Sequence, residues 1–145
     1  MKRALLGIAV VVVTGCSSLR PVAIQAGATC YRCRRPIEQI RLAGEMVDQN
    51  KHAFTFRTAG CMAKYLIEHA EDPAGVFVTD NATGKLIKAQ TALFVKATID
   101  PKTNERDFVA FGNVTTAVSF ATQNFTTPVD WMSVMAQTRA AAKGN

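Results

Sequence analysis

Apolar positions in the first half of the chain alternate with polar ones and then change to a helical spacing. Phe54 and Phe56 fall on one face of residues 52–58, the alternation typical of a strand. Beyond Gly60, apolar and aromatic residues recur at i, i+3, i+4 and i+7. The residues of that face are Met62, Tyr65, Leu66 and His69. The pattern predicts a strand that turns at Gly60 into a helix over residues 61–69.

The remainder of the chain adds further strand patterns and two more helices. Short apolar runs bounded by turn residues predict strands at 45–48, 76–80, 85–89, 91–99 and 107–111. A helix is predicted over residues 117–123, with Thr115 and Thr116 as its N-cap. The amphipathic run 129–142 predicts a loosely docked C-terminal helix.

One pattern occurs twice. Residues 54–63 and 108–117 each join an aromatic strand, through small residues, to a helix, and other strands precede each copy. This repeat predicts an α+β fold of two small ββα-type halves, with helices packed on antiparallel sheet. Cys61 and Met62 have no sulfur counterparts in the second copy, so only the first half carries a sulfur pair.

The N-terminus has the construction of an export signal. Lys2 and Arg3 precede an apolar run over residues 4–13, far shorter than the roughly 20 residues that span a bilayer as a helix. The run ends in Val13-Thr14-Gly15-Cys16, which resembles the bacterial lipobox. We therefore expect residues 1–15 to be removed and Cys16 to become an acylated N-terminus in the bilayer.

The expected location follows from the same segment. A lipid-anchored chain of this kind belongs to the cell envelope and faces the periplasm, and Ser17 favours the outer membrane over the inner one. The small, polar, Pro-containing residues 16–29 predict a flexible tether. We expect residues 30–127 to form the α+β domain and residues 128–145 a helical tail, a length that suits one compact domain.

Charge excludes one class of partner. Loss of Lys2 and Arg3 lowers the formal net charge from +6 to +4, and the basic residues are scattered apart from one cluster, Arg32, Arg34 and Arg35. No aromatic residues are interleaved with a basic face, so no nucleic-acid partner is expected. The cluster favours solubility, or contact with an acidic partner or lipid head groups.

The cysteine count points to a site. Besides Cys16, the chain has Cys30 and Cys33 in a CxxC, and Cys61 at the predicted helix start. An odd number of thiols in an exported protein cannot all pair internally, so at least one is free or held by a metal. Pro36 disfavours helix before it, which indicates a looped CxxC rather than the helical one of thioredoxins.

Soft sulfur donors favour copper. Cys and Met ligands select Cu(I) over Mg, Ca or Mn, and a helix N-terminus favours a thiolate. Cys61 and Met62 can equally be ordinary core residues. The candidate ligands are Cys30, Cys33, Cys61 and Met62, with His52 as a further candidate; His69, at the predicted helix end, is a cap or surface residue in the simpler interpretation.

A family likeness rests on the lipobox, the CxxC, Phe54-x-Phe-x-x-x-Gly-Cys-Met and the segment from Val76 to Val95. In this order they resemble the NosL-type lipoproteins, accessory copper proteins of nitrous oxide reductase. The resemblance implies a fold related to organomercurial lyase. It also implies Cu(I) binding and delivery, a recipient or donor copper protein as partner, and no catalysis.

The likeness is incomplete at the ligands. The family has a Met shortly after its CxxC, where this chain has Arg34 and Arg35. The family also has a second Met at the position that corresponds to residues 104–107 of this chain, which contain no Met. The candidate ligands that the resemblance carries over to this chain are Cys30, Cys33, Cys61 and Met62. Two other functions stay open: a thiol–disulfide protein that uses Cys30 and Cys33, and a structural lipoprotein without metal. A closed tetrahedral site would indicate structural zinc, the less favoured metal.

Overall fold

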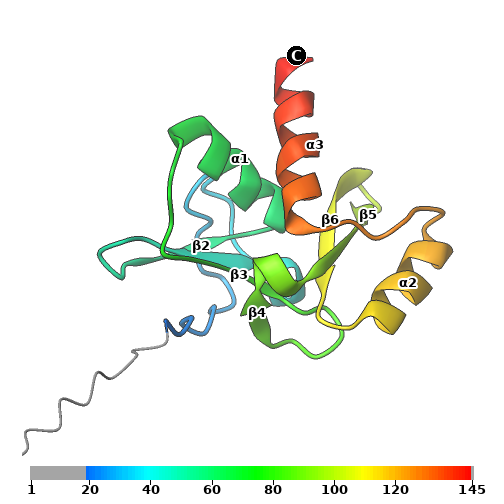
Figure 1. Cartoon of the computed structure of the whole chain (residues 1–145), viewed down its shortest axis with the longest axis horizontal. Helices are drawn as coiled ribbons and strands as arrows, with labels where there is room; N and C mark the ends of the chain where they lie inside the picture. Colours follow the sequence, from blue (N-terminus) through cyan, green and yellow to red (C-terminus); the bar gives the residue numbers. More distant parts are fainter. Residues whose placement is uncertain (1–18, 145) are drawn as a thin grey trace, which may run out of the picture.

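The computed structural model describes residues 19–144, and its first half is built on a four-stranded antiparallel sheet (Figure 1). The strand order is β2-β1-β3-β4. The strands are β1 (Gly44–Val47), β2 (Ala53–Phe56), β3 (Gly75–Thr79) and β4 (Leu86–Lys88). Helix α1 (Ala59–His69) follows β2 and buries Met62 and Leu66 against the sheet, as the helical spacing predicts.

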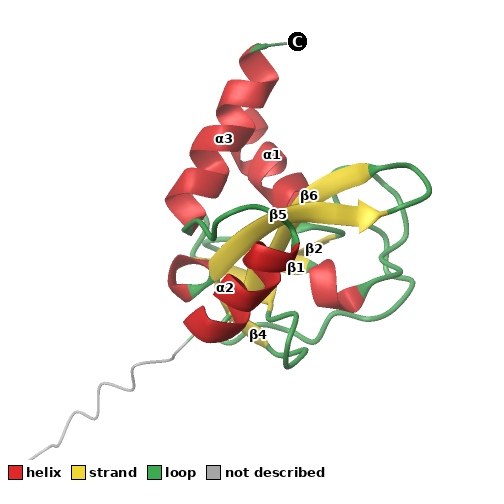
Figure 2. Ribbon diagram, turned by 90° about the vertical axis from the view of Figure 1, so that its right-hand side faces the viewer, coloured by secondary structure: helices red, strands yellow, loops and turns green. Residues whose placement is uncertain are grey.

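The second half is a long hairpin with helices on both sides. Strands β5 (Leu93–Asp100) and β6 (Glu105–Phe111) pair antiparallel, and α2 (Val114–Gln123) and α3 (Trp131–Lys143) follow. Because strand side chains alternate, one hairpin face sends Phe94 and Phe108 to the core shared with α1 and α3. The other face packs against α2 (Figure 2).

These elements confirm the α+β class, with antiparallel sheet and packed helices. The order strand–strand–helix occurs twice, as β1-β2-α1 and as β5-β6-α2. The halves are unequal, because β3 and β4 extend the first sheet to four strands while β5 and β6 stand as a pair. Two short 3-10 turns complete the list, at Ile40–Leu42 and Ala89–Thr91.

Two predicted helix starts were wrong because the capping residues were misjudged, and one strand begins earlier than predicted. Helix α2 begins at Val114, not Ala117, since the side chain of Asn113 accepts hydrogen bonds from the N–H groups of Thr115 and Thr116. Thr58 caps α1 in the same way, so that helix begins before Cys61. Glu105, predicted as loop, is the first residue of β6.

The segment before the CxxC contacts the sheet. Within the described residues, Ile24 is buried in the main core, and the Val22 N–H donates to the Glu45 carboxylate at 2.8 Å. Packing therefore begins ahead of Cys30, inside the stretch predicted as a flexible tether. The predicted signal peptide and Cys16 lie outside the described residues. Among those described, no helix has the length and apolar character to cross a membrane.

The C-terminal helix is firmly packed rather than loosely docked. Trp131 and Val134 are buried, and α3 lies beside α1 (Figure 1). The Trp131 ring contacts Phe94 of β5, with ring centroids 5.5 Å apart. The Asp130 side chain accepts from the Ser133 N–H and begins the helix. This helix therefore joins the two halves through one core.

Candidate metal centre

The CxxC lies in a tight loop, as Pro36 predicts. The Cys30 N–H donates to the Arg35 carbonyl at 2.9 Å, and the Arg34 N–H donates back to the Cys30 carbonyl at 3.0 Å. Arg34 has a φ of 61°, a left-handed conformation that tightens the turn. The loop thereby brings Cys30 and Cys33 to the same side without a helix.

Tyr31 fixes this loop to the first sheet. Its N–H donates to the Thr55 carbonyl of β2 at 2.8 Å. Its ring packs against Phe54 of β2 and Tyr65 of α1, with centroids 4.6 and 5.3 Å away. Aromatic packing of this kind holds the loop between the strand and the helix that follows it.

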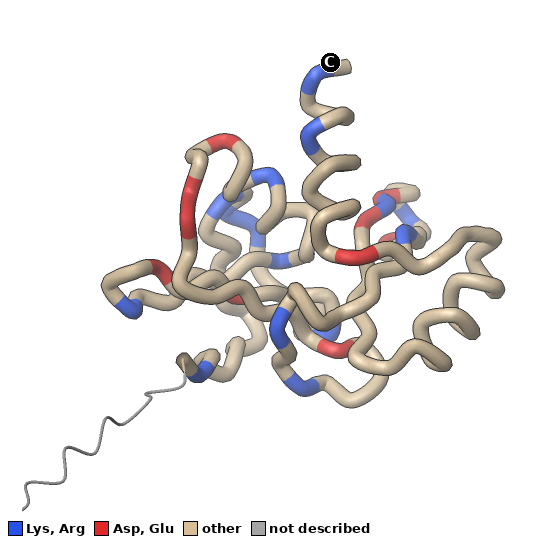
Figure 3. The backbone as a smooth tube through the Cα atoms, in the orientation of Figure 1, with Lys and Arg blue, Asp and Glu red and all other residues tan. Residues whose placement is uncertain are grey.

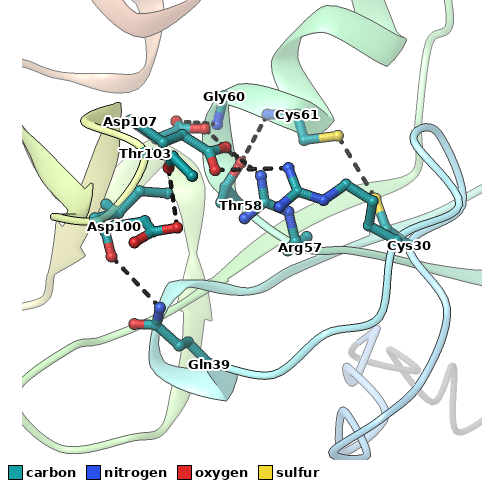
Figure 4. Close-up of polar contacts among 12 residues, drawn as sticks. Cys30, Gln39, Arg57, Thr58, Gly60, Cys61, Asp100, Thr103 and Asp107 are labelled. Carbon is teal, nitrogen blue, oxygen red and sulfur yellow. Dashed lines mark hydrogen bonds and ion pairs between the residues drawn. The ribbon is translucent and has the colours of Figure 1, made fainter.

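Cys61 is positioned by the capped N-terminus of α1 (Figure 4). Its N–H donates to the Thr58 hydroxyl at 3.1 Å. That hydroxyl donates to the Asp107 carboxylate at 2.5 Å, and the Gly60 N–H donates to the same carboxylate at 2.9 Å. Asp107 belongs to β6, so the second half of the fold holds the helix turn that carries the thiol.

Loop and helix together gather three thiols. The Sγ atoms of Cys30 and Cys61 are 3.5 Å apart, and those of all three cysteines lie within 4.8 Å of one another. Cys30 and Cys61 are buried, Cys33 is half-buried, and none is in a disulfide. Metal–sulfur bonds of about 2.3 Å allow two bound sulfurs to lie up to about 4.6 Å apart. The cluster is therefore close to the size that one metal ion needs, and small shifts of the sulfurs would complete the site.

Neighbouring groups favour the thiolate form of one of these thiols. The hydrogen bond from Cys61 lowers the pKa of Cys30 to about 4; burial opposes this, and the N–H groups of Cys33 and Arg57 add to it. The same hydrogen bond raises the pKa of Cys61, and burial raises it further. The hydrogen-bonded pair therefore favours one thiolate that accepts from the neighbouring thiol, and a soft cation bound to both sulfurs would displace the shared proton.

Two arginine–glutamate pairs flank the cluster. Arg32 donates to Glu68 of α1 at 2.5 and 2.9 Å, and Arg57 donates to Glu105 of β6. The hydrogen bond with Glu68 is the main cause that raises the pKa of Arg32, and Cys61 adds to it. Elsewhere along the chain basic and acidic residues are scattered rather than gathered in one stripe (Figure 3).

The other predicted ligands lie in different surroundings. Met62 is fully buried, and its Sδ is 3.3 Å from the place a Cβ on Gly44 would occupy, so it packs over β1. His52 lies outside the thiol cluster, where its Nδ1 is 3.1 Å from the Asp48 carboxylate on a largely exposed turn. His69 stacks on Tyr65 at the end of α1. The structure thus brings together the cysteines but not His52.

Sequence reasoning missed Arg57 and Asp107. Arg57 directly follows β2 and Asp107 is the third residue of β6, and a solvated side chain is the usual expectation for a charged residue. The single available signal was the position of Arg57, just before the cap of the helix that carries Cys61. Nothing in the sequence shows that residues 105–107 approach from the other half.

The sequence and the fold of the chain both resemble those of known proteins. No curated protein sequence matches the chain significantly. Among solved structures, the fold matches the crystal structure of the copper chaperone NosL from Shewanella denitrificans, with a TM-score of 0.65 and 16% identity over 78% of this chain and 93% of that one. The family profile described as NosL matches residues 21–138. The chain therefore belongs to the NosL family.

Proposed function

We propose that the chain binds one Cu(I) ion through Cys30, Cys33 and Cys61. The observation that carries the proposal is the convergence of three sulfurs within 4.8 Å of one another. Thiolates select Cu(I), whereas a structural zinc site closes with four ligands. Membership of the NosL family, and the description of a structural relative as a copper chaperone, support copper as the cargo.

We propose further that the ion is delivered to another copper protein, with no catalytic step. A cargo metal leaves by exchange of ligands, so one ligand has to be reachable from outside. Cys33 meets this need, because it is half-buried while the other two thiols are buried. Arg32 and Arg34, the two neighbours of Cys33 in the sequence, line a surface hollow of about 510 Å³ together with Tyr31, Tyr65, Glu68 and His69.

The proposed setting is the cell envelope. The lipobox-like sequence supports an acylated Cys16, which would hold the domain on a membrane facing the periplasm, with the outer membrane favoured by Ser17. Because Leu19 already contacts the folded domain at Gly75, only a few residues would separate the lipid from the fold. The domain would then work close to the membrane surface.

One observation favours a second function. Cys30 and Cys61, at 3.5 Å, are placed to form a disulfide, so a thiol–disulfide protein would use this pair rather than Cys30 and Cys33. Thiol counting of protein purified without reductant separates the two functions. Three free thiols support metal binding, and one free thiol supports the Cys30–Cys61 disulfide.

An anaerobic titration tests copper binding. The soluble domain from residue 16 onward, with Cys16→Ser, is titrated with Cu(I) against a competing chelator. We expect single Cys30→Ser, Cys33→Ser and Cys61→Ser variants each to bind much more weakly than the parent protein. Met62→Leu asks whether the thioether contributes. Parent affinity no higher than that of the triple cysteine variant would refute the proposal.

A further inference from the structure

A copper-loaded site would carry excess negative charge that the cysteines themselves cannot neutralise. Three thiolates around Cu(I) carry a net charge of −2, and around Zn(II) a net charge of −1. The cluster is largely buried, and buried charge is costly unless it is paired. The loaded site therefore needs a nearby cation, and needs it more for a monovalent than for a divalent metal.

Arg57 is placed to be that cation. It follows β2 directly, its side chain is 17% exposed, and its backbone N–H lies by Cys30. Among the described residues, its buried Nε–H has no hydrogen-bond partner. An unpaired buried guanidinium donor is unusual, because the desolvation penalty is not recovered. The loaded thiolate cluster would provide the missing acceptor.

Glu105, the ion-pair partner of Arg57, does not fully neutralise the positive charge in this region. Glu105 accepts a hydrogen bond from Arg57 and also lies 3.6 Å from Arg35, so two cations share one carboxylate. Burial opposes the charge on Arg57, but Glu105, and after it the Cys33 sulfur, raise its pKa. The two arginines and one glutamate therefore keep a net charge of +1.

We propose that Arg57 compensates the negative charge of the metal-loaded thiolate cluster and thereby makes the site prefer a monovalent soft cation to a divalent one. The inference rests on the proposed copper function, and it assigns Arg57 as a positioning and selectivity residue rather than a ligand. Arg57 and its partner Glu105 offer no sulfur to a metal. An ion pair would here act on the metal through charge rather than through sulfur.

The test compares metal affinities of purified variants. Cu(I) and Zn(II) affinities are measured with competing chelators for the parent protein, Arg57→Gln and Arg57→Lys. We expect Arg57→Gln to lose about 10- to 100-fold in Cu(I) affinity, the usual effect of removing a partner next to metal ligands, and clearly less in Zn(II) affinity. Arg57→Lys keeps the charge and should retain most of the affinity. Arg139→Gln, at an exposed position of α3 away from the thiols, should match the parent.

A second variant, Glu105→Gln, keeps the inference testable if Arg57→Gln fails to fold. Glu105→Gln removes the competing carboxylate, so it should tighten Cu(I) binding, while thermal melting checks that each variant is folded. Unchanged Cu(I) affinity in Arg57→Gln, equal losses for both metals, or unchanged or weaker Cu(I) binding in Glu105→Gln would overturn the inference. A parent protein that binds Cu(I) no better than the triple cysteine variant would instead refute the proposed function.

Discussion

Single residues at the thiol site differ in how tightly they are held. Cys30 is enclosed by its loop, Cys61 is fixed by the Thr58 cap, and Cys33 alone is partly open to solvent. A site with two fixed donors and one accessible donor suits uptake and release of an ion. The accessible donor is the natural point of first contact with a partner's ligand.

Glu45, in the first sheet, gives a pH-dependent prediction. It is fully buried, its Oε2 has no hydrogen-bond partner among the described residues, and burial raises its pKa above the ordinary glutamate value. Between these two pKa values the folded chain keeps a proton that the unfolded chain has released. The free energy of unfolding should therefore fall as pH rises through that window.

Glu45→Gln removes this titration, so we expect it to stabilise the protein at neutral pH by about 1 kcal/mol, the scale of a relieved buried polar group. Urea unfolding at several pH values measures the effect, and Glu38→Gln, at an exposed position, serves as the control. A variant less stable than the parent at pH 7 and equal to it at pH 4 would contradict the prediction.

At the scale of elements, the junction between α1 and β6 determines where Cys61 lies. A Cβ on Gly60 would collide with the Asp107 carboxylate, which caps the helix. We expect Gly60→Ala to lower the free energy of unfolding by about 1–3 kcal/mol, as overpacking does. Chemical denaturation measures the loss. Gly144→Ala, where the nearest atoms are 3.9 Å away, should leave stability unchanged.

Helix α3 supplies a second test of element packing. Trp131 is buried against Phe94, so Trp131→Ala should cost about 3 kcal/mol or more. Its neighbour Met132 is 74% exposed, and Met132→Ala should stay within about 0.5 kcal/mol of the parent. Similar thermal shifts for the two variants would show that the helix is not part of the core.

The hydrophobic periodicity predicted which helices and strands form better than it predicted where they begin and end or which elements they pack against. The strand-to-helix turn at Gly60 and its echo near Gly112 were visible because Phe54, Phe56, Phe108 and Phe111 mark strand faces. The cap of α2 was misplaced because Thr115 and Thr116 compete with Asn113 as capping types. The pairing of Glu105 with Arg57 was invisible, because contacts between the halves depend on tertiary packing.

For the molecule as a whole, one core holds the two halves together. The N-terminal end is proposed to attach the protein to a membrane through Cys16. We expect Cys16→Ser to move the protein from the membrane fraction to the soluble fraction of cells without changing its thermal stability. Fractionation with immunodetection measures the first effect, and mass spectrometry of the parent should show an acylated Cys16. Finding residues 1–15 still present in the membrane-bound parent would refute the proposed anchor.

The central claim, that three thiols of two chain segments hold one Cu(I) ion, is tested most directly by X-ray absorption at the copper edge. The soluble domain is loaded anaerobically with one equivalent of Cu(I), and the ligands of the metal are identified and counted. We expect ligation by sulfur with at least three sulfur donors, and the loss of one donor in Cys33→Ser. Two or fewer sulfur donors, or nitrogen and oxygen ligands in the parent protein, would contradict it.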